Sequence, residues 1–219
     1  EIAMNKLISI EEVLSKLSSG MTIMVGGFLT SGGPNQIMDA ISLSGVKDLT
    51  LICNDAAFID KGLGKLITNR QIKKLITSYI GSNSAAVEFM NSGDLEVEFS
   101  PQGTLAERIR AAGAGLGGVL TPTGLGTKVQ DNKEIITVNS KEYILEKPLK
   151  ADISFIGASI SDKSGNLYYK GTTKNFNPIM AMSADIVIAE IEELVENGTI
   201  IPENVHTPNI LVDYLYVKK

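Results

Sequence analysis

Short apolar runs alternate with amphipathic segments along the first half of the chain. Residues 21–25, 49–53 and 74–79 are brief runs rich in Ile, Leu and Val, which predicts buried strands. Residues 84–91 and 104–112, and the stretches that follow Ser9 and Pro34, carry apolar side chains at helical spacing instead. Strands separated by helices in this way predict a parallel α/β sheet.

Local signals mark where several of these helices begin and end. Ser9 and Glu12 fit a capping box, so we expect a helix to begin there. Gly20 is expected to end that helix in a left-handed conformation. Pro34 is expected at the first position of the next helix.

Two later segments carry a mixed pattern. Residues 95–100 alternate apolar with acidic side chains, which predicts a strand with one solvated face. Within the predicted helix 104–112, Leu105, Ile109 and Ala112 share one face. Arg108 lies elsewhere on that helix and is therefore predicted to point away from the core.

The middle of the chain breaks the alternation. Residues 111–126 hold six glycines, and the strand candidates 135–138 and 142–145 flank a polar turn, so we predict a small β excursion at about 115–148. Residues 153–158, 178–183 and 186–191 then return to the strand and helix pattern. We predict one domain over residues 4–219, with an open, mostly parallel sheet flanked by helices. Residues 1–3, which precede Met4, are expected to be a cloning remnant.

Composition narrows the function classes. The chain has 219 residues, 43% of them hydrophobic and 21% charged, which is typical of a globular protein. The net charge is −5 and no block of Lys or Arg stands out, so no nucleic-acid partner is expected. No apolar run approaches the ~20 residues that span a bilayer, so no membrane partner is expected. The lone Cys53 forms no internal disulfide, which agrees with a cytoplasmic location.

The stretch 24–34, MVGGFLTSGGP, is the first candidate site; we call residues 26–33 the glycine bend. It follows a predicted strand and precedes a predicted helix. It lacks the Gly-Lys-Ser/Thr of a P-loop and the spacing G-x-G-x-x-G. Two interpretations stay open: a tight turn, or a loop that cradles a phosphate, a pantetheine chain or a thioester.

Two polar stretches are further candidates. In Ser100–Thr104, the amide of Gln102 lies where open α/β sheets bind ligands, unless Gln102 or Thr104 merely caps a helix. Asn175-Phe176-Asn177-Pro178 favours a turn and a helix N-cap.

Single reactive residues point to ordinary structural roles. Cys53 ends an apolar strand and is expected to be a buried structural thiol. Asp55 follows that strand, where it either reaches a cleft or, as we favour, forms a turn. His206 is expected at the surface, and with one histidine in the chain no metal site is expected.

Taken together, the motifs resemble those of family I CoA-transferases. The run from Gly20 through Gly26-Gly27-Phe28 to Gly32-x-Pro34 is similar to their glycine-rich signature, with Ser19 where an acidic or amide residue is usual. The blocks 100–127, 145–159, 170–178 and 184–195 are similar to the family as well. The chain resembles the alpha subunit of the two-subunit 3-oxoacid and acetate/acetoacetate type.

The resemblance implies an enzyme that moves CoA between carboxylic acids through a glutamyl-CoA thioester. The nucleophilic glutamate is expected in a Ser-Glu-Asn-Gly motif of a partner beta subunit, so no catalytic nucleophile is expected in this chain. Glu196 lies in a similar Val-Glu-Asn-Gly run but is expected to be an ordinary turn residue. CoA or acyl-CoA is implied as substrate, not as a permanent cofactor, in an α2β2 assembly.

The site residues that the resemblance implies follow from its motifs. Gln102 is expected to support the reaction, and CoA is expected to approach Gly26, Gly27, Phe28, Leu29, Thr30, Ser31 and Gly32. Two other functions stay open: a sugar-phosphate isomerase, and a non-catalytic module that binds CoA or a nucleotide. An isomerase would act alone, whereas the alpha chain would need its partner.

Overall fold

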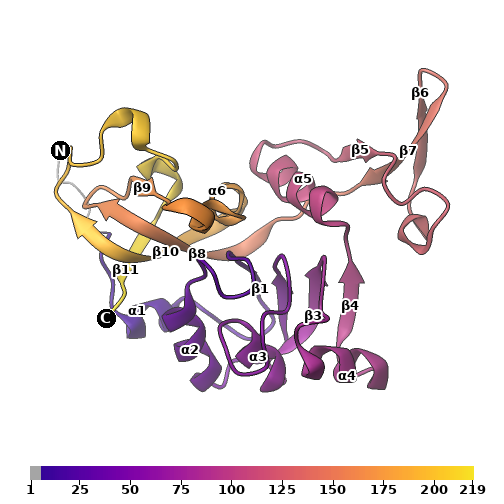
Figure 1. The fold of residues 1–219 in the computed structure, drawn as a ribbon. Coiled ribbons are helices and arrows are strands. Elements are labelled where there is room, and N and C mark those ends of the chain that lie inside the picture. Colours follow the sequence, from indigo (N-terminus) through magenta and orange to yellow (C-terminus); the bar gives the residue numbers. More distant parts are fainter. Residues whose placement is uncertain (1–5) are drawn as a thin grey trace.

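The computed structural model describes residues 6–219, so the prediction for residues 1–3 lies outside the described residues. Within that range, eight strands form one sheet with the path β11-β10-β8-β1-β2-β3-β4, and β9 pairs with β8 (Figure 1). All these pairings are parallel except that of β8 with β9, which confirms the predicted sheet. The strands are β1 Thr22–Val25, β2 Leu49–Ile52, β3 Ile72–Thr77, β4 Glu96–Phe99, β8 Ala151–Asp162, β9 Leu167–Tyr168, β10 Ala184–Val195 and β11 Tyr214–Val217.

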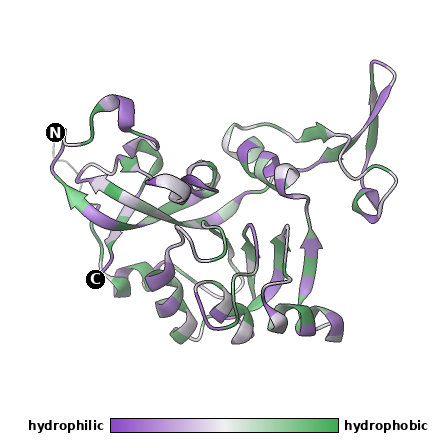
Figure 2. Ribbon diagram, viewed as in Figure 1, coloured by the Kyte–Doolittle hydropathy of each residue, from purple (hydrophilic) through white to green (hydrophobic). Residues whose placement is uncertain are grey.

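Helices cover both faces of this sheet. In β1, Ile23 and Val25 pack with α1–α4, whereas Met24 packs on the opposite face with α5 and α6. Such two-sided burial explains why the strands read as continuous apolar runs. Hydrophobic residues recur along the strands, while loops and outer helix turns are more hydrophilic (Figure 2). The helices are α1 Ile10–Ser15, α2 Asn35–Leu43, α3 Gly64–Thr68, α4 Ser84–Ser92, α5 Gln102–Gly113 and α6 Asn177–Met180.

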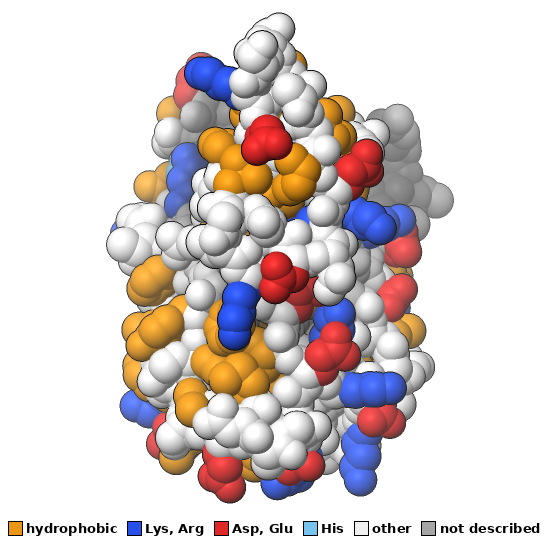
Figure 3. Space-filling model, turned by 90° about the vertical axis from the view of Figure 1, so that its right-hand side faces the viewer, with side chains coloured by type: hydrophobic (Ala, Val, Ile, Leu, Met, Phe, Trp, Pro, Cys, Tyr) orange, Lys and Arg blue, Asp and Glu red, His pale blue; other side chains and the backbone are white. Residues whose placement is uncertain are grey.

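The predicted β excursion is a separate three-stranded sheet, which we call the arm. It has the order β5-β7-β6 and projects away from the large sheet (Figure 1). Its hairpin pairs Val138 with Lys141, as the polar turn predicts. From the side that carries the arm, the surface mixes acidic, basic and apolar patches (Figure 3). The strands are β5 Val119–Thr121, β6 Ile135–Val138 and β7 Lys141–Glu146.

A cluster of charged side chains joins the arm to the large sheet. Arg108 of α5 is buried, which corrects the prediction that it points away from the core. Its guanidinium lies 2.9 Å from Glu98 on β4 and 3.8 Å from Glu146 on β7. It also donates a 2.9 Å hydrogen bond to the carbonyl of Lys147, and Lys133 contacts Glu146 at 2.8 Å. The cluster therefore fixes where the arm leaves the large sheet.

Several boundaries differ from the predictions. The capping box of Ser9 and Glu12 is present, but α1 already ends at Ser15, and Gly20 is left-handed in the turn that follows. Pro34 occupies the N-cap position, one residue before the helix it was expected to open. Phe99 is 45% exposed although it lies on the apolar side of the β4 pattern. Every helix within residues 6–219 is too short or too polar to traverse a lipid bilayer.

Candidate functional site

Four parallel strands deliver their polar residues to one edge of the sheet. Because β1–β4 run in the same direction, the residues after their carboxyl ends meet there. They enclose a hollow of about 460 Å³, which we call the edge hollow. It brings the glycine bend and Gln102, the two candidates from the sequence, to the same place. The hollow is lined by Phe28, Leu29, Asn54, Asp55, Ser78, Tyr79 and Gln102.

A chain of side-chain hydrogen bonds runs across the floor of this hollow. Gln102 donates from Nε2 to Oδ1 of Asn54 over 2.8 Å. Asn54 in turn donates from Nδ2 to Oδ2 of Asp55 over 2.7 Å. Ser78 donates to the carbonyl of Asn54 over 2.6 Å. The side chain of Gln102 is therefore held at the hollow and does not cap α5, whose N-cap has no side-chain hydrogen bond.

Asp55 also holds the glycine bend. Its Oδ2 accepts a 2.8 Å hydrogen bond from the amide of Leu29, which has a positive φ of 54°. At the tip of the bend, Phe28 and Ser31 exchange backbone hydrogen bonds of 3.0 and 2.9 Å. Asp55 additionally accepts from the amide of Ala57, which is the turn role favoured from the sequence. It both forms that turn and lines the hollow, and so it tethers a strained residue of the bend.

Two asparagines brace the bend from the other side. Asn175 accepts from the amide of Gly27 over 3.1 Å and donates to the carbonyl of Ser31 over 3.1 Å. Asn177 is fully buried and donates to the carbonyl of Gly32 over 2.9 Å. The predicted N-cap role is wrong, because α6 has no side-chain cap bond. The Asn-x-Asn-Pro run instead fixes the bend against the rest of the chain.

The glycines allow the bend to pack against its own protein. A Cβ on Gly26 would lie 1.7 Å from Oδ1 of Asn177, and one on Gly32 would lie 2.7 Å from Cα of Thr173. A Cβ on Gly157 of β8 would meet the carbonyl oxygen of Gly32 at 2.2 Å. Internal contacts therefore require these glycines even without a ligand. The approach of CoA to the bend stays a prediction.

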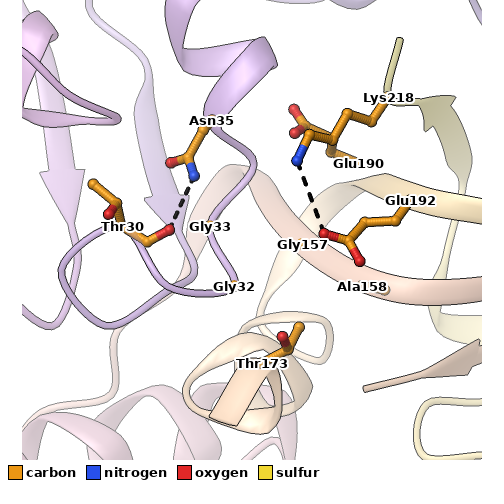
Figure 4. Close-up of a pocket in the computed structure, with 10 residues that line it drawn as sticks. All are labelled: Thr30, Gly32, Gly33, Asn35, Gly157, Ala158, Thr173, Glu190, Glu192 and Lys218. Carbon is orange, nitrogen blue, oxygen red and sulfur yellow. Dashed lines mark hydrogen bonds and ion pairs between the residues drawn. The ribbon is translucent and has the colours of Figure 1, made fainter. Parts of the chain in front are cut away.

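A smaller polar cavity of about 160 Å³ lies behind the bend (Figure 4). Gly32 and Gly33 face Gly157 and Ala158 of β8 across it, and Glu190 lines it from β10. Among the described residues, the backbone amides of Gly32 and Gly33 donate no hydrogen bond. The bend thus retains unused donors of the kind that bind anions or carbonyl oxygens.

Glu190 supplies the N-terminal cap that α2 lacks locally. The N-cap residue Pro34 makes no side-chain bond, and the Glu190 carboxylate accepts from the amides of Gln36 at 3.3 Å and Ile37 at 2.8 Å. Burial raises the pKa of Glu190, while the two amides and Lys218 act in the opposite direction. A carboxylate at a helix N-terminus also interacts favourably with the helix dipole. Strand β10 therefore anchors the helix that follows the bend.

The remaining candidates lie outside the hollow. Cys53 is buried, as predicted, and its pKa is raised mainly by burial. His206 is half-buried, not at the open surface, because it stacks on Tyr168 with ring centroids 4.7 Å apart. Glu196 is an exposed turn residue paired with Lys163. Within residues 6–219, no three His, Cys, Asp or Glu side chains are grouped to hold a metal ion.

Residues that line the edge hollow were identified from the sequence, but the contacts that hold them in place were not. Glu190 was not considered, although a glutamate within the apolar run 184–191 signals a buried, partnered charge. The link between Asn54 and Gln102 joins residues 48 positions apart, and no local pattern encodes it.

Several proteins of known name are similar to this chain in sequence. The alpha subunit of acetoacetyl-CoA:acetate/butyrate CoA transferase from Clostridium acetobutylicum is 52% identical over 96% of this chain and 97% of its own length. The alpha subunit of acetate CoA-transferase from Escherichia coli is 46% identical over 98% and 97%. One subunit of succinyl-CoA:3-ketoacid coenzyme A transferase from Helicobacter pylori is 45% identical over 97% and 92%.

Solved structures share the fold. An acyl-CoA transferase from Escherichia coli, in a thioester complex with CoA, superposes with a TM-score of 0.87 at 19% identity. The match covers 99% of this chain but 48% of that one, so this chain spans about half its length. Glutaconate coenzyme A-transferase from Acidaminococcus fermentans gives 0.85 at 22% identity, over 97% of this chain and 75% of that one.

The family model described as coenzyme A transferase matches residues 7–218. Neither the sugar-phosphate isomerase nor the non-catalytic binding module receives support from these matches. These matches confirm the resemblance that was based on the glycine-rich signature and the four sequence blocks. The chain belongs to the coenzyme A transferase family.

Proposed function

We propose that this chain is the alpha subunit of an enzyme that moves CoA between short-chain acids such as acetate, butyrate and acetoacetate. Its partner is a beta subunit that carries the nucleophilic glutamate, in an α2β2 assembly in the cytoplasm. Relatives named as alpha subunits of such enzymes, matched over nearly their whole length, support the proposal. The lone, buried Cys53 agrees with a reducing compartment.

One observation supports the need for a beta subunit that supplies the nucleophile. Of the residues that line the edge hollow, Asp55 alone has a carboxyl group, and its two oxygens accept three N–H hydrogen bonds. A carboxylate occupied in this way is a poor nucleophile. The hollow therefore offers a binding wall but no free carboxylate to attack an acyl-CoA.

The chemistry defines what the binding wall must do. Attack of the partner's glutamate on the acyl-CoA carbonyl releases the CoA thiolate and forms an acyl anhydride. The thiolate then attacks the glutamyl carbonyl, which frees the first acid as its carboxylate and leaves glutamyl-CoA. A second carboxylate reverses both steps. Each intermediate is sensitive to water, so the open hollow needs a cover during turnover.

Gln102 and the glycine bend are the residues of this chain that we assign to substrate. Asn54 occupies one N–H of the Gln102 amide. Among the described residues, no partner occupies its Oε1, so the amide remains available to a carboxylate or thioester. The unused amides of Gly32 and Gly33 suit the carbonyl groups of a pantetheine chain. A separate outer hollow of about 480 Å³ is lined by Phe28 and Ser31 of the bend, with Thr172 and Asn175, and offers further space for CoA.

Acyl-CoA exchange tests the proposal. Acetyl-CoA and butyrate are incubated with the purified chain, and with the same chain assembled with the beta subunit encoded by the neighbouring gene. Butyryl-CoA should form only with the assembled enzyme. Full exchange by the chain alone would refute the composite site.

Gly27→Val tests the bend separately in the assembled enzyme. Gly27 has a φ of 119°, which a valine cannot adopt without strain, so the KM for acyl-CoA should rise at least tenfold. Gly117→Ala is the control, because a Cβ there would meet nothing within 4 Å. Unchanged KM and kcat in Gly27→Val would mean that the bend does not bind CoA.

A further inference from the structure

Within the described chain, the edge hollow is lined by an acidic side chain and by no basic one. Its lining includes the carboxyl group of Asp55 and no lysine, arginine or histidine. The other lining residues are amides, a hydroxyl and the apolar or aromatic side chains of Phe28, Leu29 and Tyr79. A ligand in this hollow therefore meets one negative charge and, from this chain, no positive charge to balance a second.

Asp55 is held in place by hydrogen bonds. It is 4% exposed, and its side-chain oxygens accept from three N–H donors: the amides of Leu29 and Ala57, and Nδ2 of Asn54. Its charge acts on its surroundings, because it adds to burial in raising the pKa of the adjacent Cys53 thiol. The charge that disfavours a thiolate at Cys53 would also disfavour a carboxylate in the hollow.

We infer that Asp55 is a specificity-determining residue, which makes the edge hollow select acids whose tail carries no charge. The inference rests on the proposed function, with the reacting carboxyl group at Gln102 and the tail among the other lining residues. Monocarboxylates such as acetate, butyrate and acetoacetate fit this environment. A dicarboxylate such as succinate would bring a second carboxylate close to Asp55 without a compensating cation.

Family membership leaves this choice open. Relatives at 52% and 46% identity are named for acetate or butyrate, and one at 45% is named for succinyl-CoA. Identity differences of this size do not separate the two acid classes. In this chain, the charge of Asp55 in the hollow is the feature that favours one class over the other.

The test measures kcat/KM for butyrate and for succinate, with acetyl-CoA as donor, in the assembled enzyme. The unaltered enzyme should prefer butyrate strongly. Asp55→Asn keeps the shape of the side chain and removes its charge, so the succinate-to-butyrate ratio of kcat/KM should rise by roughly tenfold. Asp60→Asn removes the same charge from an exposed position nearby and should leave the ratio unchanged.

A second pair of variants adds a charge instead. Tyr79 lines the hollow and is 54% exposed at its mouth. Tyr79→Lys should raise the ratio in favour of succinate, whereas Tyr79→Met, of similar length and uncharged, should not. Together the two pairs separate the charge of the hollow from its shape.

Each outcome decides one point. If Asp55→Asn lowers activity toward both acids equally, Asp55 only positions the bend and the inference is wrong. If the unaltered enzyme uses succinate as well as butyrate, the inference is wrong but the proposed function stands. Absence of exchange with every acid would refute the proposed function itself.

Discussion

The side-chain amide of Asn177 donates a 2.9 Å hydrogen bond to the carbonyl oxygen of Gly32, although the two residues are 145 positions apart. The same amide nitrogen donates to the carbonyl of Thr173 over 2.8 Å, and Oδ1 accepts from the amide of Gly157 over 3.0 Å. One buried amide thus ties the glycine bend to β8 and to the segment before α6.

Asn177→Asp should destabilise the protein and loosen the bend. The substitution keeps the shape but replaces two donated hydrogen bonds with a carboxylate facing two carbonyl oxygens in a fully buried position. We expect the free energy of unfolding to fall by about 3 kcal/mol or more, measured by urea denaturation. In the assembled enzyme, the KM for acyl-CoA should rise at temperatures where the protein stays folded. Equal stability of the two proteins would contradict the bracing role.

Gly26→Ala should be costly because its Cβ would overlap Oδ1 of Asn177. The neighbour is buried and hydrogen-bonded, so it cannot move aside cheaply. A loss of about 3 kcal/mol is expected in the same denaturation experiment. Gly117→Ala, with no atom within 4 Å of the new Cβ, serves as the matched control and should be nearly neutral.

Arg108→Ala should weaken the attachment of the arm. Arg108 is buried between Glu98 and Glu146, and its removal leaves the buried Glu146 with Lys133 as its remaining cation. We expect a loss of about 3 kcal/mol and faster amide hydrogen exchange in β5 and β7. Arg110→Ala removes an exposed arginine from the same helix and should leave stability within error. Similar effects of the two substitutions would show that the buried cluster does not hold the arm.

The raised pKa of Glu190 leads us to expect that the stability of the protein depends on pH. Burial raises its folded pKa above the ordinary value of 4.5, so its stabilising contribution is complete below 4.5 and is lost as the pH rises through the folded pKa. Lys218 opposes this shift and Asp39 adds to it. Glu190→Gln removes the titration, so the stability of the variant relative to the unaltered protein should improve as the pH rises from 4.5 toward neutrality.

Urea denaturation across that pH range measures this difference. Glu192→Gln, at an exposed neighbour that lines the same cavity, is the control and should keep the pH dependence of the unaltered protein. A constant difference between the Glu190 variant and the unaltered protein at every pH would contradict the prediction.

Much of the fold could be predicted because its signals are local. Buried parallel strands read as apolar runs, and the hairpin of the arm is marked by its polar turn. The positions of the glycine bend and Gln102 followed from strand ends alone, and the structure brings both into one hollow. Strand β11, the short strand β9 and helix α3 were not predicted.

The contacts that hold the glycine bend and α2 in place could not be predicted, since each of them joins segments that are distant in the sequence. Asn177 and Glu190 contact the bend and α2 across about 150 residues. Locally, an asparagine before a proline signals a cap, and that signal was misleading here. The prediction for Arg108 was wrong for the same reason. Its position on the helix suggests that the side chain is exposed to solvent, whereas the arm covers it.

The strand order has a consequence for synthesis. β1 lies in the middle of the sheet, but its neighbour β8 and the braces Asn177 and Glu190 all come from the second half of the chain. A nascent chain released from the ribosome up to β4 would expose one long side of β1, and its glycine bend would lack these contacts. The bend is thus made before β8, Asn177 and Glu190, and it acquires its shape only after they have been made.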